Sequence, residues 1–218
     1  MQFEYNKVYT SKQGKEVHKA RQISSVVAAR YQKGVAAEKR MTDYIIQMMN
    51  IAQDVDFRIV EDVCYKHNGN YSQVDAVIVC RKGIFCVEYK SWRGQVYPTT
   101  TEFWRIVKDT RVDKFSNPVM QNAEHCRMCT AITRYSLKNI IDTSKINFRN
   151  LVVFDDDSSI MPGPYVNVMG YMDVPGYINK LNDEYSTEIL DVVEKFLRHV
   201  AEANKHHFDK RHKFQMMK

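Results

Sequence analysis

A stretch of two apolar, β-branched runs, residues 73–90, constrains the fold of this chain more than any other feature. Its two halves have the length and composition of β-strands, and Lys82-Gly83 between them is typical of a tight hairpin turn. Buried strands seldom carry charge, because a buried ion loses its hydration. This hairpin nevertheless holds Asp75 on its first strand and Glu88 and Lys90 on its second.

The spacing of these three charges predicts that they share one face of the hairpin. Side chains two residues apart on a strand point the same way, so Glu88 and Lys90 project together and Tyr89 points away. A two-residue loop at Lys82-Gly83 places Asp75 opposite Lys90, with Glu88 diagonal to Asp75. Opposed Cβ atoms lie about 5 Å apart and diagonal ones about 7–8 Å. Two carboxylates at that separation can share a divalent cation, whereas a three-residue turn would break this geometry.

Six landmarks follow one another along the chain. They are Gly34-Val35-Ala36-Ala37-Glu38, Gln73-Val74-Asp75, Gly83-Ile84-Phe85, Glu88-Tyr89-Lys90, Trp104, and Asn117-Pro118 with Gln121-Asn122. In this order they resemble the NERD (nuclease-related) domain of the PD-(D/E)xK nuclease superfamily, over residues 31–154. The proline that gives the superfamily its name is Val74 here, a position that varies among nucleases of this type.

The resemblance implies a restriction-endonuclease-like α/β fold: a mixed central sheet flanked by helices, with a helical C-terminal extension. The expected segments are an N-terminal arm and helix (1–30), the NERD-like nuclease core (31–154), a C-terminal helical part of the same domain (155–204) and a basic tail (205–218). No linker long enough to separate two domains is present in the sequence.

The resemblance also implies metal-dependent hydrolysis of phosphodiester bonds, with DNA as the expected substrate and RNA as the alternative. Hard oxygen ligands such as those of Asp75 and Glu88 suit Mg²⁺ or Mn²⁺. Glu38 would complete the acidic cluster or bind a second metal. Lys90 would orient the attacking water or neutralise charge in the transition state. The alternative for these charges is a plain buried ion pair.

Helical periodicity predicts four amphipathic helices, over residues 16–30, 35–50, 117–135 and 184–204. Gly34 is expected to separate the first two, and Asn117-Pro118 is typical of a helix start. Glu38 lies on the same stripe as Met41 and Ile45. A carboxylate there is costly unless it is paired or metal-bound, and the alternative is a solvated rim position.

Gln121 and His125 are four residues apart and therefore share one face of the third predicted helix. Such a face is usually solvated surface. In the NERD-like interpretation Gln121 points towards the carboxylates and is a catalytic candidate. His125 is a weaker candidate for contact with the scissile phosphate.

Further strands are predicted over residues 57–63, 95–97, 102–107 and 148–154, giving a central sheet of four or more strands with helices on both faces. Trp104 in the third of these is expected in the core, with a stacking surface as the alternative. Asp155-Asp156-Asp157 follows the last strand. These aspartates are expected to be solvated, because no turn glycine or distal glutamate completes a calcium loop.

Charge favours polyanionic partners. The net charge is +6 and the pI near 9.0. The basic tail is expected to contact phosphates non-specifically and to be disordered without nucleic acid, with a solvated terminus as the alternative. Its assigned nucleic-acid-binding residues are Lys205, Lys210, Arg211 and Lys213.

The remaining composition indicates an ordinary soluble protein. The five cysteines are expected to be reduced and structural. No apolar run approaches the about 20 residues that span a bilayer, and residues 1–7 lack a signal-peptide core. The expected location is therefore the cytoplasm, without membrane contact.

Two rival functions remain open at this point. One is a catalytically silent nucleic-acid-binding or adaptor module on the same fold, and the other is an interaction protein without nucleic-acid contact. Glu38, Asp75, Glu88 and Lys90 favour the enzyme, because a silent copy has no need of them. The chain could also form a homodimer, and any helicase or regulator that acts with it is expected to be a separate chain.

Overall fold

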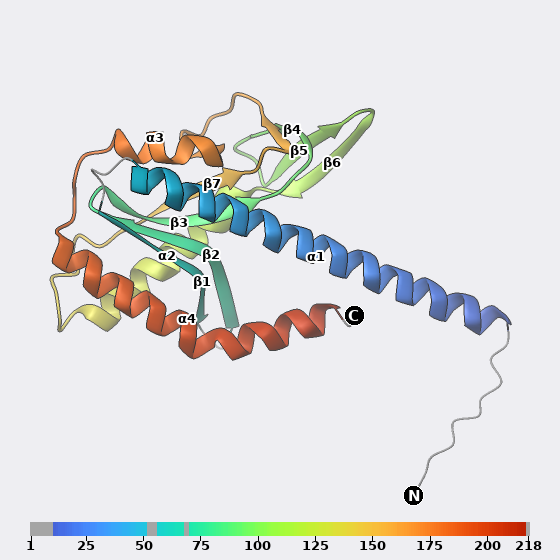
Figure 1. Ribbon diagram of the computed structural model, residues 1–218, viewed down its shortest axis with the longest axis horizontal. Helices are drawn as coiled ribbons and strands as arrows, with labels where there is room; N and C mark the ends of the chain where they lie inside the picture. Colours follow the sequence, from blue (N-terminus) through green and yellow to red (C-terminus); the bar gives the residue numbers. More distant parts are fainter. Residues whose placement is uncertain (1–10, 52–55, 68–69, 217–218) are drawn as a thin grey trace, which may run out of the picture.

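The computed structural model describes residues 11–51, 56–67 and 70–216 (Figure 1). The described residues form a mixed α/β fold around a five-stranded sheet in the order β1-β2-β3-β7-β9. Its strands are β1 (Phe57–His67), β2 (Asn70–Cys80), β3 (Gly83–Lys90), β7 (Phe148–Phe154) and β9 (Val168–Gly170). The first three are antiparallel to one another, and β7 and β9 run parallel to β3. The expected mixed central sheet is confirmed.

Helices cover both faces of this sheet, as expected (Figure 1). One face packs on α1 (Ser11–Ile51) and α3 (Val174–Asn179), which follows the single 3-10 turn η1 (Tyr171–Asp173). The other face packs on α2 (Pro118–Leu137) and α4 (Thr187–Met216). None of the helices in the described ranges is both long and apolar enough to cross a membrane.

A second, four-stranded sheet lies beside the first, in the order β6-β5-β4-β8. Its strands are β4 (Gly94–Tyr97), β5 (Phe103–Lys108), β6 (Arg111–Ser116) and β8 (Ser158–Ile160). The sequence predicted β4 and β5 but not β6, nor a separate sheet. The strand β6 was missed because it carries charged residues on both faces and is exposed along most of its length, so apolar residues do not alternate along it.

The two helices predicted upstream of the hairpin are one helix. Gly34 was expected to separate them, but α1 continues through it from Ser11 to Ile51. A glycine in a helix interior costs only about 1 kcal/mol relative to alanine, and Met41, Ile45 and Met49 are fully buried on the sheet. The first half of α1 extends beyond both sheets (Figure 1). Most of the expected arm, residues 1–10, lies outside the described residues.

The last predicted helix does not end at Asn204. The helix α4 continues to Met216, so the expectation of a disordered tail is wrong for residues 205–216. The physical reason is that no glycine or proline occurs between residues 187 and 216, so no residue there ends the helix. Lys205, Lys210, Arg211 and Lys213 lie in this helical segment, but their side chains are outside the described part of the structure.

The register of the hairpin differs from the predicted one. Cys80 pairs with Gly83 and Ala76 with Val87, so Arg81 and Lys82 form the turn. Continued by one pair, this ladder places Asp75 opposite Glu88 instead of Lys90. The glycine belongs to the strand because the Phe85 ring folds over it: a Cβ at Gly83 would lie 2.6 Å from Phe85 Cζ. The three charges stay on one face, because the pairing shifts by an even number of residues.

Candidate active site

The three charges of the hairpin meet near the end of β3, on the face that α2 covers. Asp75 Oδ2 accepts a hydrogen bond of 2.9 Å from the backbone N–H of Tyr89. Lys90 Nζ donates to Glu88 Oε1. Glu88 is only 3% exposed, and Lys90 is half-buried. The structure therefore brings together the aspartate, the glutamate and the lysine that the sequence singled out.

Electrostatics at this cluster disfavour its negative charges. Burial raises the pKa of the Asp75 carboxyl well above its usual range, and the carboxylates of Glu88 and Glu38 raise it further. The Tyr89 N–H and the Lys90 ammonium act in the opposite direction but do not cancel this rise. Any additional cation that approaches Asp75 would therefore stabilise the ionised form of its carboxyl.

Glu38 joins the cluster from α1. The side chain is half-buried, and burial raises the pKa of its carboxyl. Asp62 and Glu88 raise that pKa further, whereas Lys90 lowers it. Of the two alternatives, a solvated rim and a member of the acidic cluster, these interactions support the second.

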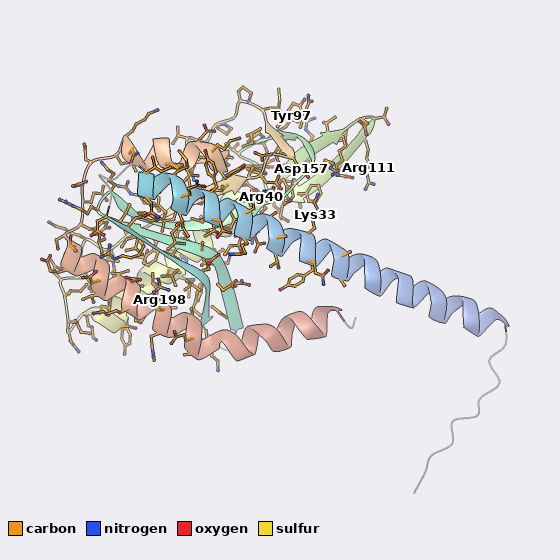
Figure 2. The ribbon with its side chains drawn as sticks, in the orientation of Figure 1. Lys33, Arg40, Tyr97, Arg111, Asp157 and Arg198 are labelled. Carbon is orange, nitrogen blue, oxygen red and sulfur yellow. The ribbon has the colours of Figure 1, made fainter. Side chains whose placement is uncertain are left out.

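Two of the three consecutive aspartates after β7, Asp155 and Asp157, connect α1 to the sheet. Asp157 Oδ2 lies 3.0 Å from Lys33 Nζ, and buried Asp155 Oδ2 lies 3.6 Å from an Arg40 guanidinium nitrogen. Figure 2 shows Lys33 and Arg40 along α1 with Asp157 beside them. Because Lys33 and Arg40 flank Glu38 on the helix, these contacts hold Glu38 over the sheet end. The expectation that the aspartates are merely solvated is wrong for Asp155.

The donor set fits an open metal site and does not fit a closed cage. No group of three or more His, Cys, Asp or Glu side chains in the described ranges is placed to hold a metal ion. Asp75 and Glu88 each use one oxygen, for the Tyr89 N–H and the Lys90 ammonium respectively. Their other oxygens accept no hydrogen bond from any described residue. Mg²⁺ is commonly held by one or two carboxylates, with water and substrate phosphate completing its shell.

His125 lies closer to this cluster than the sequence indicated. Its Nδ1 is 3.1 Å from the Tyr65 hydroxyl and 3.2 Å from Ser72 Oγ, and its Nε2 is 3.9 Å from Glu88 Oε2. The buried Nε2 has no hydrogen-bond partner among the described residues. Burial lowers the pKa of His125, although Glu88 acts against this. The only sequence signal was its position four residues after Gln121.

Gln121 is exposed on α2, and its side chain forms no hydrogen bond with any described residue. The structure does not place it among the carboxylates, and its catalytic role stays a prediction. Its neighbours in the motif are structural. Asn117 caps α2 by accepting from the Val119 N–H at 2.9 Å, and buried Asn122 donates to the Cys86 carbonyl at 2.8 Å.

Trp104 and the cysteines belong to the structural core. Trp104 is 0% exposed, donates through Nε1 to the Thr99 carbonyl at 2.8 Å and stacks on Phe154. The core assignment is therefore confirmed over the stacking surface. All five cysteines are free and buried, as expected of structural thiols.

Comparison with known proteins gives one match. A family model described as a nuclease-related domain, NERD, matches residues 33–155, which is more than half of the chain. No curated protein and no solved structure matches the sequence. The matched region contains Glu38, the β2–β3 hairpin and the whole of α2.

Proposed function

Because this chain belongs to the nuclease-related domain family, we propose that it is a metal-dependent nuclease that hydrolyses phosphodiester bonds in DNA. The restriction-endonuclease-like fold that the family implies agrees with the mixed central sheet flanked by helices. The observation that carries the proposal is an uncompensated cluster of carboxylates. The carboxylates of Glu88 and Glu38 raise the pKa of Asp75, that of Glu88 also raises the pKa of Glu38, and the Lys90 ammonium, which donates to Glu88, acts in the opposite direction on both.

A plain ion pair accounts for only part of this cluster. The pair between Glu88 and Lys90 would balance one negative charge with one positive charge. It leaves Asp75 and Glu38 without a comparable cation partner, and buried carboxylates without a partner are costly. His125 does not supply the missing charge, because burial lowers its pKa. A divalent cation between Asp75 and Glu88 would offset this excess.

Each residue of the cluster is proposed to have its own role in phosphodiester hydrolysis. Mg²⁺ or Mn²⁺ supplies Lewis-acid activation of the phosphoryl group and of a bound water. Asp75 and Glu88 would hold that ion through the oxygens that the Tyr89 N–H and the Lys90 ammonium leave available. Lys90, fixed by Glu88, would orient the attacking water or neutralise charge in the transition state. Glu38 would complete the acidic cluster from α1 or hold a second ion.

The substrate assignment rests on the family and on charge. A net charge of +6 favours a polyanion, and DNA is proposed with RNA as the alternative. Lys205, Lys210, Arg211 and Lys213 on the last part of α4 are proposed to add non-specific phosphate contacts, and Gln121 is proposed to assist at the carboxylates. The rival, a silent nucleic-acid-binding module on the same fold, is tested by the same experiment.

The test compares wild-type protein with Lys90→Ala and Lys82→Ala on circular single- and double-stranded DNA. The two lysines lie at opposite ends of β3, and their side chains are almost equally exposed, at 18% and 17%. Lys90→Ala should reduce cleavage by about 10²–10⁴ while metal and DNA binding remain. Lys82→Ala should cleave as wild type does.

Each assay is run with Mg²⁺, with Mn²⁺ and with a chelator, and a thermal melt in Mg²⁺ checks folding. A folded Lys90→Ala protein that binds DNA and cleaves at the wild-type rate would contradict the mechanism. Wild-type protein that binds DNA but cleaves nothing with any divalent metal would support the silent module instead.

A further inference from the structure

The four-stranded sheet has two very different faces. Its inner face carries Val96, Trp104 and Ile106, which are buried against Val152 and Phe154 of the central sheet. Its outer face carries the alternate residues of the same strands and is largely exposed. An exposed sheet face is normally covered with polar side chains, so the composition of this one is informative.

Aromatic and cationic side chains lie next to one another on the outer face. Tyr97 pairs with Arg105, and Arg105 pairs with Lys114, which forms one row across three strands. Arg105 Cζ lies 5.9 Å over the Tyr97 ring. Phe103 is two residues from Arg105 on the same strand, about 7 Å away, and it is 48% exposed. Val112 continues the face on β6 and is 57% exposed.

The charges on this face are all positive. No carboxylate lies on the outer face of the described sheet, and neither Arg105 nor Lys114 forms an ion pair with a described residue. Asp113, the acidic residue within β6, pairs with Ile106 on the inner-face parity and binds Arg111. Cations without an ion-pair partner among the described residues, beside exposed aromatic rings, are typical of a surface that tracks a phosphate backbone while the rings stack on bases.

The hairpin of β5 and β6 contacts residues beside the candidate active site through its inner face. The Phe115 ring of β6 lies 4.9 Å from the Trp92 ring, and Lys90 Nζ lies 5.9 Å over Trp92. In Figure 2 the labelled Tyr97 and Arg111 mark the strands β4 and β6 of this sheet. The inner face of the β5–β6 hairpin thus connects the exposed outer face to Trp92 and Lys90, which lie on the other side of the four-stranded sheet.

We propose that the outer face of the four-stranded sheet binds single-stranded nucleic acid. Bases stack on Phe103 and on the Arg105–Tyr97 pair, and phosphates lie at Arg105 and Lys114. Single strands are favoured over duplex because unpaired bases can leave their stack and meet a flat aromatic surface. Cleavage of a bound strand rests on the proposed nuclease function. The binding itself does not, because it needs neither a metal nor an active site.

The binding experiment uses the full chain in EDTA, so that cleavage cannot interfere. A fluorescein-labelled 20-nucleotide oligothymidylate is titrated at several salt concentrations and followed by anisotropy. The double variant Arg105→Gln/Lys114→Gln should lower the slope of log affinity against log salt by about 1.4, that is about 0.7 for each lost phosphate contact. Phe103→Ser should weaken binding about 5- to 150-fold at fixed salt.

The matched control is Lys138→Gln/Lys195→Gln, which removes two exposed cations from α2's C-terminal cap and from α4. It should leave the slope within experimental error of wild type. An equal loss of slope in both double variants would overturn the proposal, because the hairpin would then add only general charge. Tighter binding of a duplex of the same length would also overturn it.

Analytical ultracentrifugation of the same proteins tests the alternative that a second copy of this chain occupies the outer face. The strand β6 is at the edge of its sheet and could pair with a second copy of this chain. A wild-type dimer that Phe103→Ser converts to monomer would assign the face to self-association and overturn the proposal. A monomeric wild-type protein that binds the oligonucleotide would support it. If binding holds but no cleavage occurs with any metal, the proposed nuclease function fails and this inference stands.

Discussion

The two sheets of this protein depart from the usual distribution of residues in opposite ways. The central sheet buries charges, with Glu88 among fully buried apolar neighbours on β3. The four-stranded sheet exposes apolar rings, with Phe103 and Val112 on its outer face. Buried polar groups and exposed apolar patches are the informative exceptions in a folded protein.

The difference indicates what each sheet contributes. In the central sheet, packing removes water from around Asp75 and Glu88, which strengthens their interaction with any cation. In the second sheet, one face packs and the other is left open to a ligand. Both exceptions lower the stability of the fold, and functional sites are where such losses are expected. Substitutions on each sheet can therefore test the contrast.

The largest effect on stability is expected at the buried face of the second sheet. Trp104→Ala should lower the free energy of unfolding by about 3–5 kcal/mol, because the ring is fully buried and stacks on Phe154. Urea denaturation followed by circular dichroism measures the change. A loss below about 1 kcal/mol would show that the two sheets do not share a packed core.

A smaller, pH-dependent effect is expected in the central sheet. Because the pKa of Asp75 is raised in the folded protein, its carboxyl favours folding below the ordinary Asp pKa and opposes folding as the pH rises through the raised value. Asp75→Asn cannot ionise. Without metal it should be more stable than wild type at pH 8, by on the order of 1 kcal/mol or about 2–4 °C in Tm.

Two controls accompany the Asp75→Asn measurement. The difference from wild type should shrink to zero as the pH falls to the ordinary Asp range, because both side chains are then neutral. Added Mn²⁺ should raise the Tm of wild type and leave that of Asp75→Asn unchanged. Calorimetric Mn²⁺ binding of equal strength by the two proteins would place the metal at another site.

The smallest effect on stability is expected at the open face of the second sheet. Phe103→Ala should change the free energy of unfolding by less than about 0.5 kcal/mol, because the ring is half exposed, although the residue is next to Trp104 on the same strand. Urea denaturation compares it directly with Trp104→Ala. A loss as large as that of Trp104→Ala would mean that this face is packed and is not available to a ligand.

Much of the central sheet could be predicted from the sequence because its signals are local. The apolar runs defined β2, β3 and β7, and two-residue spacing put Asp75, Glu88 and Lys90 on one face despite the wrong register. The even shift preserved that face, since strand side chains alternate with a period of two. The cap of α2 followed in the same way, from Asn117-Pro118.

Other parts of the site depend on contacts between residues far apart in the chain. Lys33 and Arg40 orient α1 through Asp157 and Asp155, and no local pattern encodes such pairs. His125 reached Glu88 because Tyr65 and Ser72, from β1 and β2, hold its ring. Gln121 shares its helix face but is exposed, since spacing along one helix does not determine which residue the neighbouring strands cover.

The sequence by itself indicated the family and, through that resemblance, the mixed central sheet, because six motifs follow one another in the family's order. It also predicted the shared face of the three hairpin charges, because strand side chains alternate with a period of two. Only the tertiary structure decided the hairpin register, the second sheet, the continuity of α1 through Gly34 and the place of His125. Each of these depends on packing between distant segments. The folding of the Phe85 ring over Gly83 outweighed the turn preference of that glycine, and burial of the methionines of α1 outweighed the small helix penalty of Gly34.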